Sequence, residues 1–406
     1  MAHIEDRWYK TVAVDGRPTQ VPKPGCGKGM RYRVRYIAPD GREKSESFPD
    51  RRKREAQAFL ARVQADIHNG TYVDPDAGRV TFREYATQWL ASVGGDLNTR
   101  DRLAREFRLH VFPAFGDEPL GAVLPATLRA WTRQLADRGL SPGFRRNVFG
   151  SVSAAFAAAV DDRLIPGNPA TAKTVRAPRY VPGRVVPWPV DRLAQIRAHL
   201  PERYRVAVDL GAGCGLRQGE VFGVSPDDIE RDRPVLHVVR QVKVIREHLV
   251  FAPPKGGKTR EVPLPESVAV RLRAHAETYP STPVTLPWTG LDGPPQTVPL
   301  YLTTTYDNAV FRTRFNDRVW KPALRAAGVE VGRRNGMHVL RHTYASVLLD
   351  AGESIKALSL YLGHADPGFT LRVYTHLLPS SEDRTRAAID RAFGHRPEYP
   401  DGLETA

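Results

Sequence analysis

His338-Val-Leu-Arg341-His342 is followed along the chain by Leu362-Gly363-His364 and then by Leu371-Arg-Val-Tyr374. The first stretch predicts the start of a helix whose two histidines and arginine share one face. The second predicts a helix end, because glycine commonly follows the last residue of a helix. The third places a tyrosine ten residues after the preceding histidine. Basic side chains, histidines and one tyrosine therefore recur in a fixed order within a short part of the chain.

Two earlier motifs carry the remaining basic groups of the pattern. Gly215-Leu-Arg217-Gln-Gly-Glu220 sits at a helix junction, and Pro254-Lys255-Gly-Gly-Lys258-Thr-Arg-Glu-Val-Pro-Leu sits on a predicted hairpin. Taken alone, Arg217 is a surface or capping arginine with Glu220, three residues on, as its ion-pair partner. Lysines in a glycine-rich turn are usually solvated. The five motifs in this order are not explained by such separate structural roles.

Together these side chains suit the exchange of a phosphodiester bond. The transition state concentrates charge on the non-bridging oxygens, which two arginines can bind in bidentate fashion. A lysine can protonate the leaving 5′ oxygen, and a histidine can take the proton of an attacking phenol, whose ordinary pKa is about 10. A tyrosine nucleophile stores the bond energy as a phosphotyrosine ester. Because the arginines carry the charge, we expect no metal and no cofactor.

The order and local sequence of the motifs resemble the tyrosine recombinase family, the phage integrases in particular. The resemblance covers about residues 80–390 and is strongest after residue 205. It implies cleavage and rejoining of DNA at specific sites, to integrate or excise a phage or another mobile element. The catalytic residues that it implies are Arg217, Lys255, His338, Arg341, His364 and Tyr374.

The resemblance assigns the basic residues to the charge and the leaving group. Arg217 and Arg341 form the phosphate clamp. Lys255 is the general acid for the 5′ oxygen, and Lys258 in the same motif is the alternative.

The remaining residues act on the nucleophile and the scissile phosphate. By resemblance, Tyr374 attacks and forms a 3′-phosphotyrosine, His338 assists proton transfer, and His364 hydrogen-bonds the phosphate. We interpret Glu220 as structural support for the neighbouring arginine and His342 as a packing residue.

The sequence predicts a multidomain, mainly α-helical chain with small β-sheets. Arg31-Tyr-Arg-Val-Arg-Tyr-Ile has the alternation of a half-buried strand, and residues 51–69 have apolar side chains on one helical face. The predicted parts are an N-terminal strand–helix module that binds arm-type DNA (1–78), an all-helical core-binding domain (79–175), a proline-rich linker (176–189), an α+β catalytic domain of the tyrosine recombinase type (190–395) and a tail (396–406).

Periodicity gives more detail in the catalytic domain. Strand composition marks residues 235–244 and 249–263, whereas residues 280–303 hold eight prolines and glycines and are predicted to be largely loop. Helices are predicted at about 190–200, 203–213, 266–278, 308–327, 338–351 and 354–362. A short amphipathic helix is predicted at 382–393, with Ile389 and Phe393 on its apolar face.

Composition indicates the partners. Lys and Arg number 60 against 45 Asp and Glu, and basic residues exceed acidic ones in each of the segments 1–78, 79–180 and 181–406, so the whole length suits a polyanion. Two cysteines cannot form a disulfide framework or a four-cysteine zinc site. No apolar run could span a bilayer, so we expect a cytoplasmic protein without a membrane partner. The family resemblance implies double-stranded DNA attachment sites, a homotetramer on DNA, and an excision factor or DNA-bending accessory protein.

Three other interpretations stay open. Val208-Asp-Leu-Gly-Ala-Gly-Cys-Gly215 is similar to the glycine-rich loop of S-adenosylmethionine-dependent methyltransferases, but such a loop must follow a strand and the preceding residues look helical. His338 and His342 have the spacing of His-Glu-x-x-His zinc sites, yet residue 339 is Val, so the general base is missing. The third is a DNA-binding regulator that keeps the recombinase fold without its chemistry.

Overall fold

The computed structural model describes residues 2–14, 17–181, 183–374, 386, 389–390 and 392–393. The chain divides into two compact units, residues 1–182 and 183–406, and the division falls within the proline-rich segment 176–189. Most of the predicted helix 382–393 and all of the tail 396–406 lie outside the described residues.

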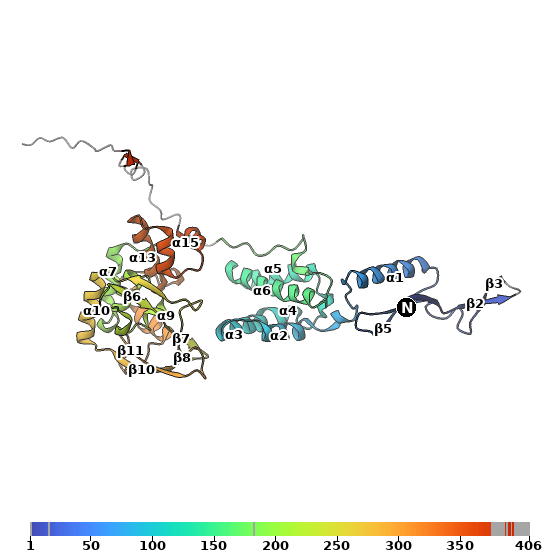
Figure 1. The fold of residues 1–406 in the computed structure, drawn as a ribbon, viewed down its shortest axis with the longest axis horizontal. Helices are drawn as coiled ribbons and strands as arrows, with labels where there is room; N and C mark the ends of the chain where they lie inside the picture. Colours follow the sequence, from blue (N-terminus) through green and yellow to red (C-terminus); the bar gives the residue numbers. More distant parts are fainter. Residues whose placement is uncertain are drawn as a thin grey trace, which may run out of the picture. The chain divides into compact units, whose positions relative to one another are not determined.

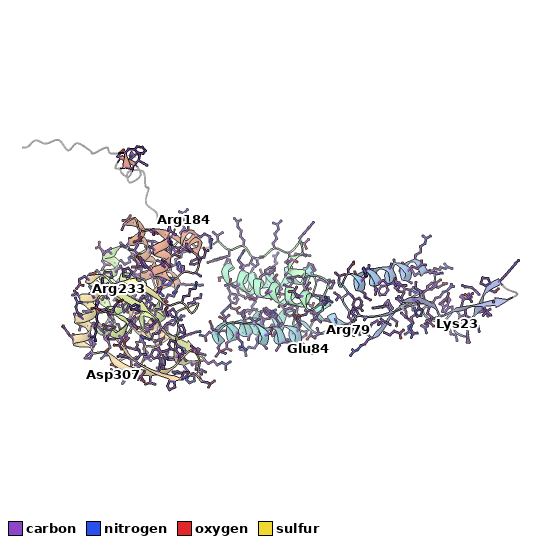
Figure 2. The ribbon with its side chains drawn as sticks, viewed as in Figure 1. Lys23, Arg79, Glu84, Arg184, Arg233 and Asp307 are labelled. Carbon is purple, nitrogen blue, oxygen red and sulfur yellow. The ribbon has the colours of Figure 1, made fainter. Side chains whose placement is uncertain are left out.

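The first unit begins with a small antiparallel sheet packed on one helix (Figure 1). Strands β1 (His3–Asp6), β4 (Tyr32–Ile37) and β5 (Glu43–Phe48) lie in the order β1–β4–β5, and helix α1 (Lys53–His68) packs on them. The predicted alternation is confirmed in β4, where Tyr32, Val34 and Tyr36 are buried and the arginines between them point to the other face. Strands β2 (Tyr9–Val14) and β3 (Arg17–Pro22) form a separate hairpin, which ends beside Lys23 (Figure 2).

Four main helices form the rest of the first unit, as predicted: α2 (Phe82–Ser92), α3 (Leu97–Glu106), α5 (Pro125–Asp137) and α6 (Pro142–Asp161). A π-helical turn (Phe107–Val111) and the short helix α4 (Phe112–Phe115) continue α3. Helix α2 starts at a capping box, in which the Thr81 hydroxyl accepts from the Glu84 N–H and the Glu84 carboxylate accepts from the Thr81 N–H. The core between these helices is largely aromatic and contains Phe82, Phe107, Phe115, Trp131 and Phe156.

Helices dominate the second unit: α7 (Val190–His199), α8 (Val206–Gly213), α9 (Gln218–Val221), α10 (Glu266–Thr278), α11 (Arg312–Phe315), α12 (Lys321–Ala326), α13 (His338–Asp350), α14 (Ile355–Leu362) and α15 (Pro367–Tyr374). Helix α8 packs closely on α13, because a Cβ atom at Gly211 would lie 2.7 Å from the Leu340 side chain. Helix α13 also holds the segment before α7: the Trp188 N–H donates to the Thr343 hydroxyl at 2.9 Å.

The strands of the second unit form three antiparallel pairs. Strand β6 (Val235–Val238) pairs with β9 (Arg260–Pro263), β7 (Gln241–Ile245) with β8 (His248–Ala252), and β10 (Thr282–Pro287) with β11 (Pro295–Leu300). The last pair shows that the prediction of a loop over 280–303 was wrong. Its prolines lie opposite one another, as Pro283–Pro299 and Pro287–Pro295. In a two-stranded ribbon, alternate pairs make no ladder hydrogen bonds, so these prolines can be accommodated without losing one.

Candidate active site

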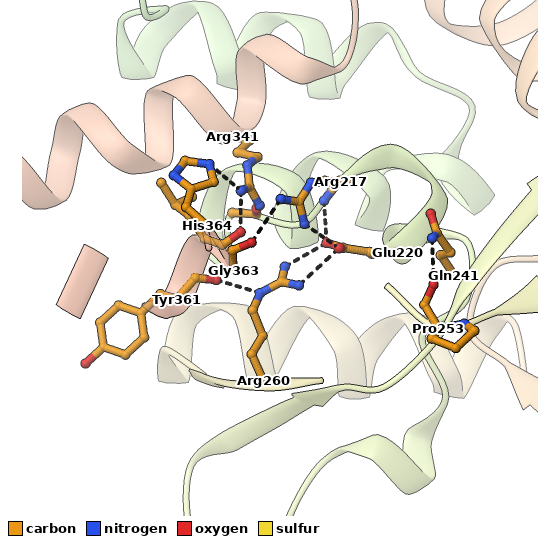
Figure 3. A network of polar contacts seen from close by, with 11 residues as sticks. Arg217, Glu220, Gln241, Pro253, Arg260, Arg341, Tyr361, Gly363 and His364 are labelled. Carbon is orange, nitrogen blue, oxygen red and sulfur yellow. Dashed lines mark hydrogen bonds and ion pairs between the residues drawn. The ribbon is translucent and has the colours of Figure 1, made fainter. Parts of the chain in front are cut away.

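Arg217 lies just before α9, where the chain leaves α8. Its backbone N–H and its Nη1 each donate to the Glu220 carboxylate at 2.8 Å, and its Nη2 donates to the Gly363 carbonyl at 3.4 Å (Figure 3). The Glu220 side chain is fully buried, whereas that of Arg217 is 22% exposed. The predicted pairing of Glu220 with Arg217 is therefore confirmed, and it orients a guanidinium that solvent can still reach.

A third arginine, Arg260 on β9, was given no role by the sequence analysis. Its Nη1 and Nη2 donate to the two Glu220 oxygens at 3.0 and 2.7 Å, and its Nε donates to the Tyr361 carbonyl at 2.7 Å (Figure 3). Burial acts to raise the pKa of Glu220, but the hydrogen bonds from Arg260 and the charges of Arg260 and Arg217 outweigh it and lower that pKa to about 2. Arg260 thus joins the charged carboxylate to the end of α14.

Arg341, in the first turn of α13, is buried with its guanidinium among backbone carbonyls. Its Nη1 donates to the Gly215 carbonyl at 2.9 Å, and its Nη2 donates to the Leu362 carbonyl and, at 3.0 Å, to His364 Nε2. Burial, with the nearby charge of Arg217, lowers the pKa of Arg341 to about 9, so it remains charged at neutral pH. The turn before α9 therefore holds the arginine of α13.

The turn at the end of α14 binds the other arginine of the pair, Arg217. The Gly363 carbonyl accepts from Arg217, and the residue has a φ of +63°, the left-handed conformation in which glycine commonly ends a helix. Gly215, which accepts from Arg341, has a φ of +64°. Two glycine turns therefore bring the two arginines together from motifs far apart in the sequence.

His364 follows the second of these turns. Because an arginine can only donate, Nε2 of His364 accepts from Arg341, and its Nδ1 carries the proton and donates to the Thr370 hydroxyl at 2.7 Å. Burial and the neighbouring arginines lower the pKa of His364 to about 3, so the ring is neutral at pH 7. His364 thus links Arg341 to α15, the helix that ends in Tyr374.

Tyr374 is almost completely buried, and its hydroxyl lies 2.8 Å from Nδ1 of His342. Burial raises the pKa of Tyr374 to about 12, although Arg341 and Arg217 act to lower it. Burial, with His338 and Arg341 nearby, lowers the pKa of His342 to about 4. The phenol and the imidazole are therefore both neutral in this state.

His338 lies one helical turn before His342, but the hydrogen bond to the Tyr374 phenol is made by His342. His338 keeps an exposed surface, burial of the rest of the ring lowers its pKa, and it packs edge-to-face on His342 with ring centroids 4.6 Å apart. We expected His342 only to pack, and its hydrogen bond to Tyr374 was missed. The available signal was its position four residues after His338, one helical turn along the same face.

Lys255 lies apart from this network. The predicted hairpin over 249–263 was wrong, because β8 pairs with β7 and β9 pairs with β6. The two-residue turn Arg246-Glu247, with positive φ at both residues, gives β8 its partner β7. Lys255 and Lys258 are exposed on the connection from β8 to β9.

The described residues also bear on the other interpretations. Residues 206–213 form helix α8, so the glycine-rich stretch does not follow a strand as a methyltransferase loop must. In the part of the chain that the structure describes, no group of three or more His, Cys, Asp or Glu residues could hold a metal ion. No described helix is long and apolar enough to cross a membrane.

Proteins similar in sequence include integrases of phages and prophages and tyrosine recombinases. A sequence profile of the phage integrase family matches residues 189–381. The integrase of Mycobacterium phage D29 is 26% identical over 354 residues, which cover 84% of this chain and 89% of that protein. A putative prophage phiRv2 integrase of Mycobacterium tuberculosis is 26% identical over 365 residues, covering 88% of this chain and 92% of the relative.

Solved structures with the same fold come from the same group of proteins. The Tn1549 transposon integrase in complex with a circular intermediate DNA superposes with a TM-score of 0.63 at 21% identity and covers 77% of this chain and 99% of that one. A lambda integrase dimer bound to a core site gives a TM-score of 0.54 at 17% identity, over 92% and 95% of the two chains. These likenesses establish the predicted fold class. With the sequence relatives and the Arg, His and Tyr motifs, the family match shows that residues 189–381 form a domain of the phage integrase family.

Proposed function

We propose that this chain cuts double-stranded DNA at attachment sites and rejoins it through a 3′-phosphotyrosine bond at Tyr374, and so integrates or excises a phage or another mobile element. The convergence of Arg217 and Arg341 on the same two glycine turns is the observation that supports this most directly. Two fixed guanidinium groups suit the non-bridging oxygens of one phosphate.

The arginines have the role of a preorganised charge clamp. Glu220 and the Gly363 carbonyl orient Arg217, and the Gly215 and Leu362 carbonyls orient Arg341, so little reorganisation is needed when charge builds up on the phosphate. His364, in contact with Arg341, is the residue that we assign to hydrogen-bonding the scissile phosphate.

Lys255 is assigned to protonating the 5′ oxygen, and Lys258 stays the alternative. Both lie on an exposed, glycine-containing connection, and such a segment can adjust when a duplex binds. We assign His338, which is exposed to solvent near Arg217 and Arg341, to assisting proton transfer.

The assembly follows from the proposed reaction. A lambda integrase, 18% identical with a TM-score of 0.55, has been solved as a tetramer bound to a Holliday junction. We propose that this chain likewise acts as a homotetramer on two duplexes, in the cytoplasm where its DNA lies. An excision factor or DNA-bending protein would set the direction, and residues 79–175 would bind the core sites.

The N-terminal module is proposed to bind arm-type DNA. Arg31, Arg33 and Arg35 alternate on β4, but Arg31 is held by Asp6 and Asp50, each at 3.0 Å. Among the described residues, Arg33 contacts the Ser45 hydroxyl and Arg35 contacts the exposed Glu43 carboxylate, which makes these two the better candidates for phosphate contacts.

A suicide substrate tests the proposal. A duplex with an attachment site from the DNA flanking the gene is nicked on the 3′ side of the cleavage point. The short fragment that carries the freed 5′ hydroxyl then diffuses away and leaves the protein attached to the 3′ phosphate. Wild-type protein should form a covalent adduct, and Tyr374→Phe should bind the duplex without forming one. Binding by the wild-type protein without any adduct would instead support a regulator that keeps the fold without the chemistry.

A further inference from the structure

The unassigned polar contact closest to the reacting atom is the one between His342 and Tyr374. The Tyr374 hydroxyl and His342 Nδ1 are 2.8 Å apart, and the ring centroids are 5.6 Å apart at an interplanar angle of 62°. Tyr374 is 1% exposed, so bulk water cannot readily remove the phenol proton. In this structure the acceptor within hydrogen-bond distance of the phenol is His342.

We propose that His342 is the catalytic residue that takes the phenol proton of Tyr374 at its Nδ1 when the tyrosine attacks DNA, and returns it on rejoining. This inference rests on the proposed function. It requires the tautomer of His342 that carries its proton on Nε2, so that Nδ1 can accept from the hydroxyl.

The proton and the bonds balance in both directions. In cleavage, Tyr374 Oη forms a bond to phosphorus, the bond from phosphorus to the 5′ oxygen breaks, the phenol proton moves to His342, and the general acid protonates the 5′ oxygen. In rejoining, the 5′ hydroxyl attacks, its proton returns to that acid, the bond from phosphorus to Tyr374 breaks, and His342 protonates the leaving phenol. No oxidant, reductant or further reactant is needed.

The surroundings explain why the tyrosine is unreactive without DNA. Without DNA, the phenol of Tyr374 has a raised pKa of about 12 and the imidazole of His342 has a lowered pKa of about 4. Proton transfer from the phenol to the imidazole is therefore strongly unfavourable in this state. Bond formation to phosphorus makes the phenol oxygen far more acidic, and the developing negative charge beside His342 favours its protonated form. The transfer therefore becomes favourable only as the phosphorus bond forms.

The charged and titratable groups that act on this contact come from α13, from α15 and from Arg217 just before α9, whose charge acts to lower the pKa of Tyr374. From α13, His338 lies against the His342 ring and Arg341 lies one residue before it. From α15, Tyr374 itself faces the ring. Burial, His338 and Arg341 lower the pKa of His342, and the negative charge of a bound DNA phosphate would act in the opposite direction.

Two substitutions separate proton transfer from packing. His342→Asn keeps an acceptor oxygen near the position of Nδ1 but cannot take a proton, and His342→Gln is the second variant if the first unfolds. The matched control is His275→Asn, because His275 in α10 is another half-buried histidine of the same unit with a lowered pKa. Its ring nitrogen contacts the Tyr301 carbonyl and its ring packs on Tyr279, so it also combines a polar contact with packing on a tyrosine. Thermal unfolding is measured for all three.

The rate of adduct formation on the suicide duplex is then measured for each variant. His342→Asn should slow it by roughly 10²- to 10⁴-fold, the usual contribution of general base catalysis, while His275→Asn leaves it unchanged. 3-Fluorotyrosine at position 374, whose phenol is more acidic, should restore part of the lost rate. A duplex with sulfur in place of the leaving 5′ oxygen, which needs no general acid, should not restore it.

Three outcomes would overturn the inference. The first is an unchanged rate of adduct formation in a folded His342→Asn protein. The second is a faster rate, which would show that the contact only restrains the tyrosine, and the third is full recovery of the rate on the duplex with the 5′ sulfur. Because each outcome is read against a wild-type protein that forms adducts, it is distinguishable from failure of the proposed function, in which the wild type forms none.

Discussion

At the scale of single residues, one buried carboxylate organises the candidate site. Glu220 accepts from Arg217 and from Arg260, and the two arginines in turn reach the backbone of residues 361–363. Removal of a buried carboxylate that is paired with two arginines costs much stability, because it leaves the two cations uncompensated. The site therefore depends on Glu220 for its shape, while the arginines are proposed to contact DNA.

The clamp itself gives the first prediction. Arg217→Ala and Arg341→Ala should each slow DNA cleavage by roughly 10²- to 10³-fold, because each removes donors from the charged transition state. Adduct formation on the suicide duplex measures the rate, and Arg233→Ala, which removes an exposed arginine of the same unit, is the control. Cleavage should also persist in EDTA. Near-normal cleavage by either clamp variant would remove that arginine from the site.

Glu220→Gln should destabilise the second unit by about 3–5 kcal/mol at pH 7, measured by urea unfolding. Glu230→Gln, which weakens the solvent-exposed contacts with Arg233 and His237, should cost far less. The pKa of Glu220 is lowered from 4.5 to about 2, so its stabilisation is complete above pH 4.5 and is lost as the pH falls toward 2. Glu220→Gln should lack this loss of stability at low pH. An equally steep fall of the free energy of unfolding with decreasing pH in Glu220→Gln would contradict this explanation.

At the scale of elements, short turns bring the motifs together. The turn after α14 brings Gly363 against Arg260, since a Cβ atom there would lie 3.0 Å from the arginine side chain. Gly363 also has a positive φ, a conformation that costs residues other than glycine about 1–2 kcal/mol. Substitution there tests how much the clamp depends on the turn.

Gly363→Ala should lose both stability and cleavage rate, because the added methyl displaces Arg260 from Glu220. Gly328→Ala is the matched control, since Gly328 has a φ of +67° and no atom within 4 Å of its added Cβ. Both variants carry the same backbone strain. Their difference in urea midpoint and in cleavage rate therefore measures the Arg260 contact, and equal losses in the two variants would show that the contact contributes nothing.

How far the sequence predicts the structure also differs between elements. The helices around Arg341 and Gly363 follow from apolar periodicity and a helix-ending glycine, and both elements were predicted. The partners of Arg260 were not, because they join strand β9 to the distant end of α14, and periodicity carries no information on such contacts. The β10–β11 hairpin was missed because its prolines, read singly, indicate a loop, whereas paired across a ribbon they do not.

At the scale of the whole molecule, the N-terminal module has a core of its own. Tyr32, Val34 and Tyr36 pack with α1, apart from the aromatic core of the four helices that follow. Such a separate core is typical of a module with a separate task. The outward arginines of β4 suit a second DNA site.

Deletion of residues 1–78 should leave cleavage at a core site intact and impair recombination between full attachment sites. Arg33→Ala with Arg35→Ala in the full chain should do the same by weakening arm-site binding, measured by gel shift. Arg31→Ala should instead lower the stability of the module, because Arg31 joins Asp6 and Asp50. If the truncated protein recombines as well as the full chain, the strand face is only a solvated surface.

Tyr374 is the residue that we propose to form the covalent bond to DNA. The most direct measurement is mass spectrometry of the wild-type adduct after nuclease and protease digestion. We expect a nucleotide remnant joined through phosphate to the hydroxyl of Tyr374, and no modified peptide from Tyr374→Phe. A remnant on any other residue, or an adduct that persists in Tyr374→Phe, would contradict this proposal.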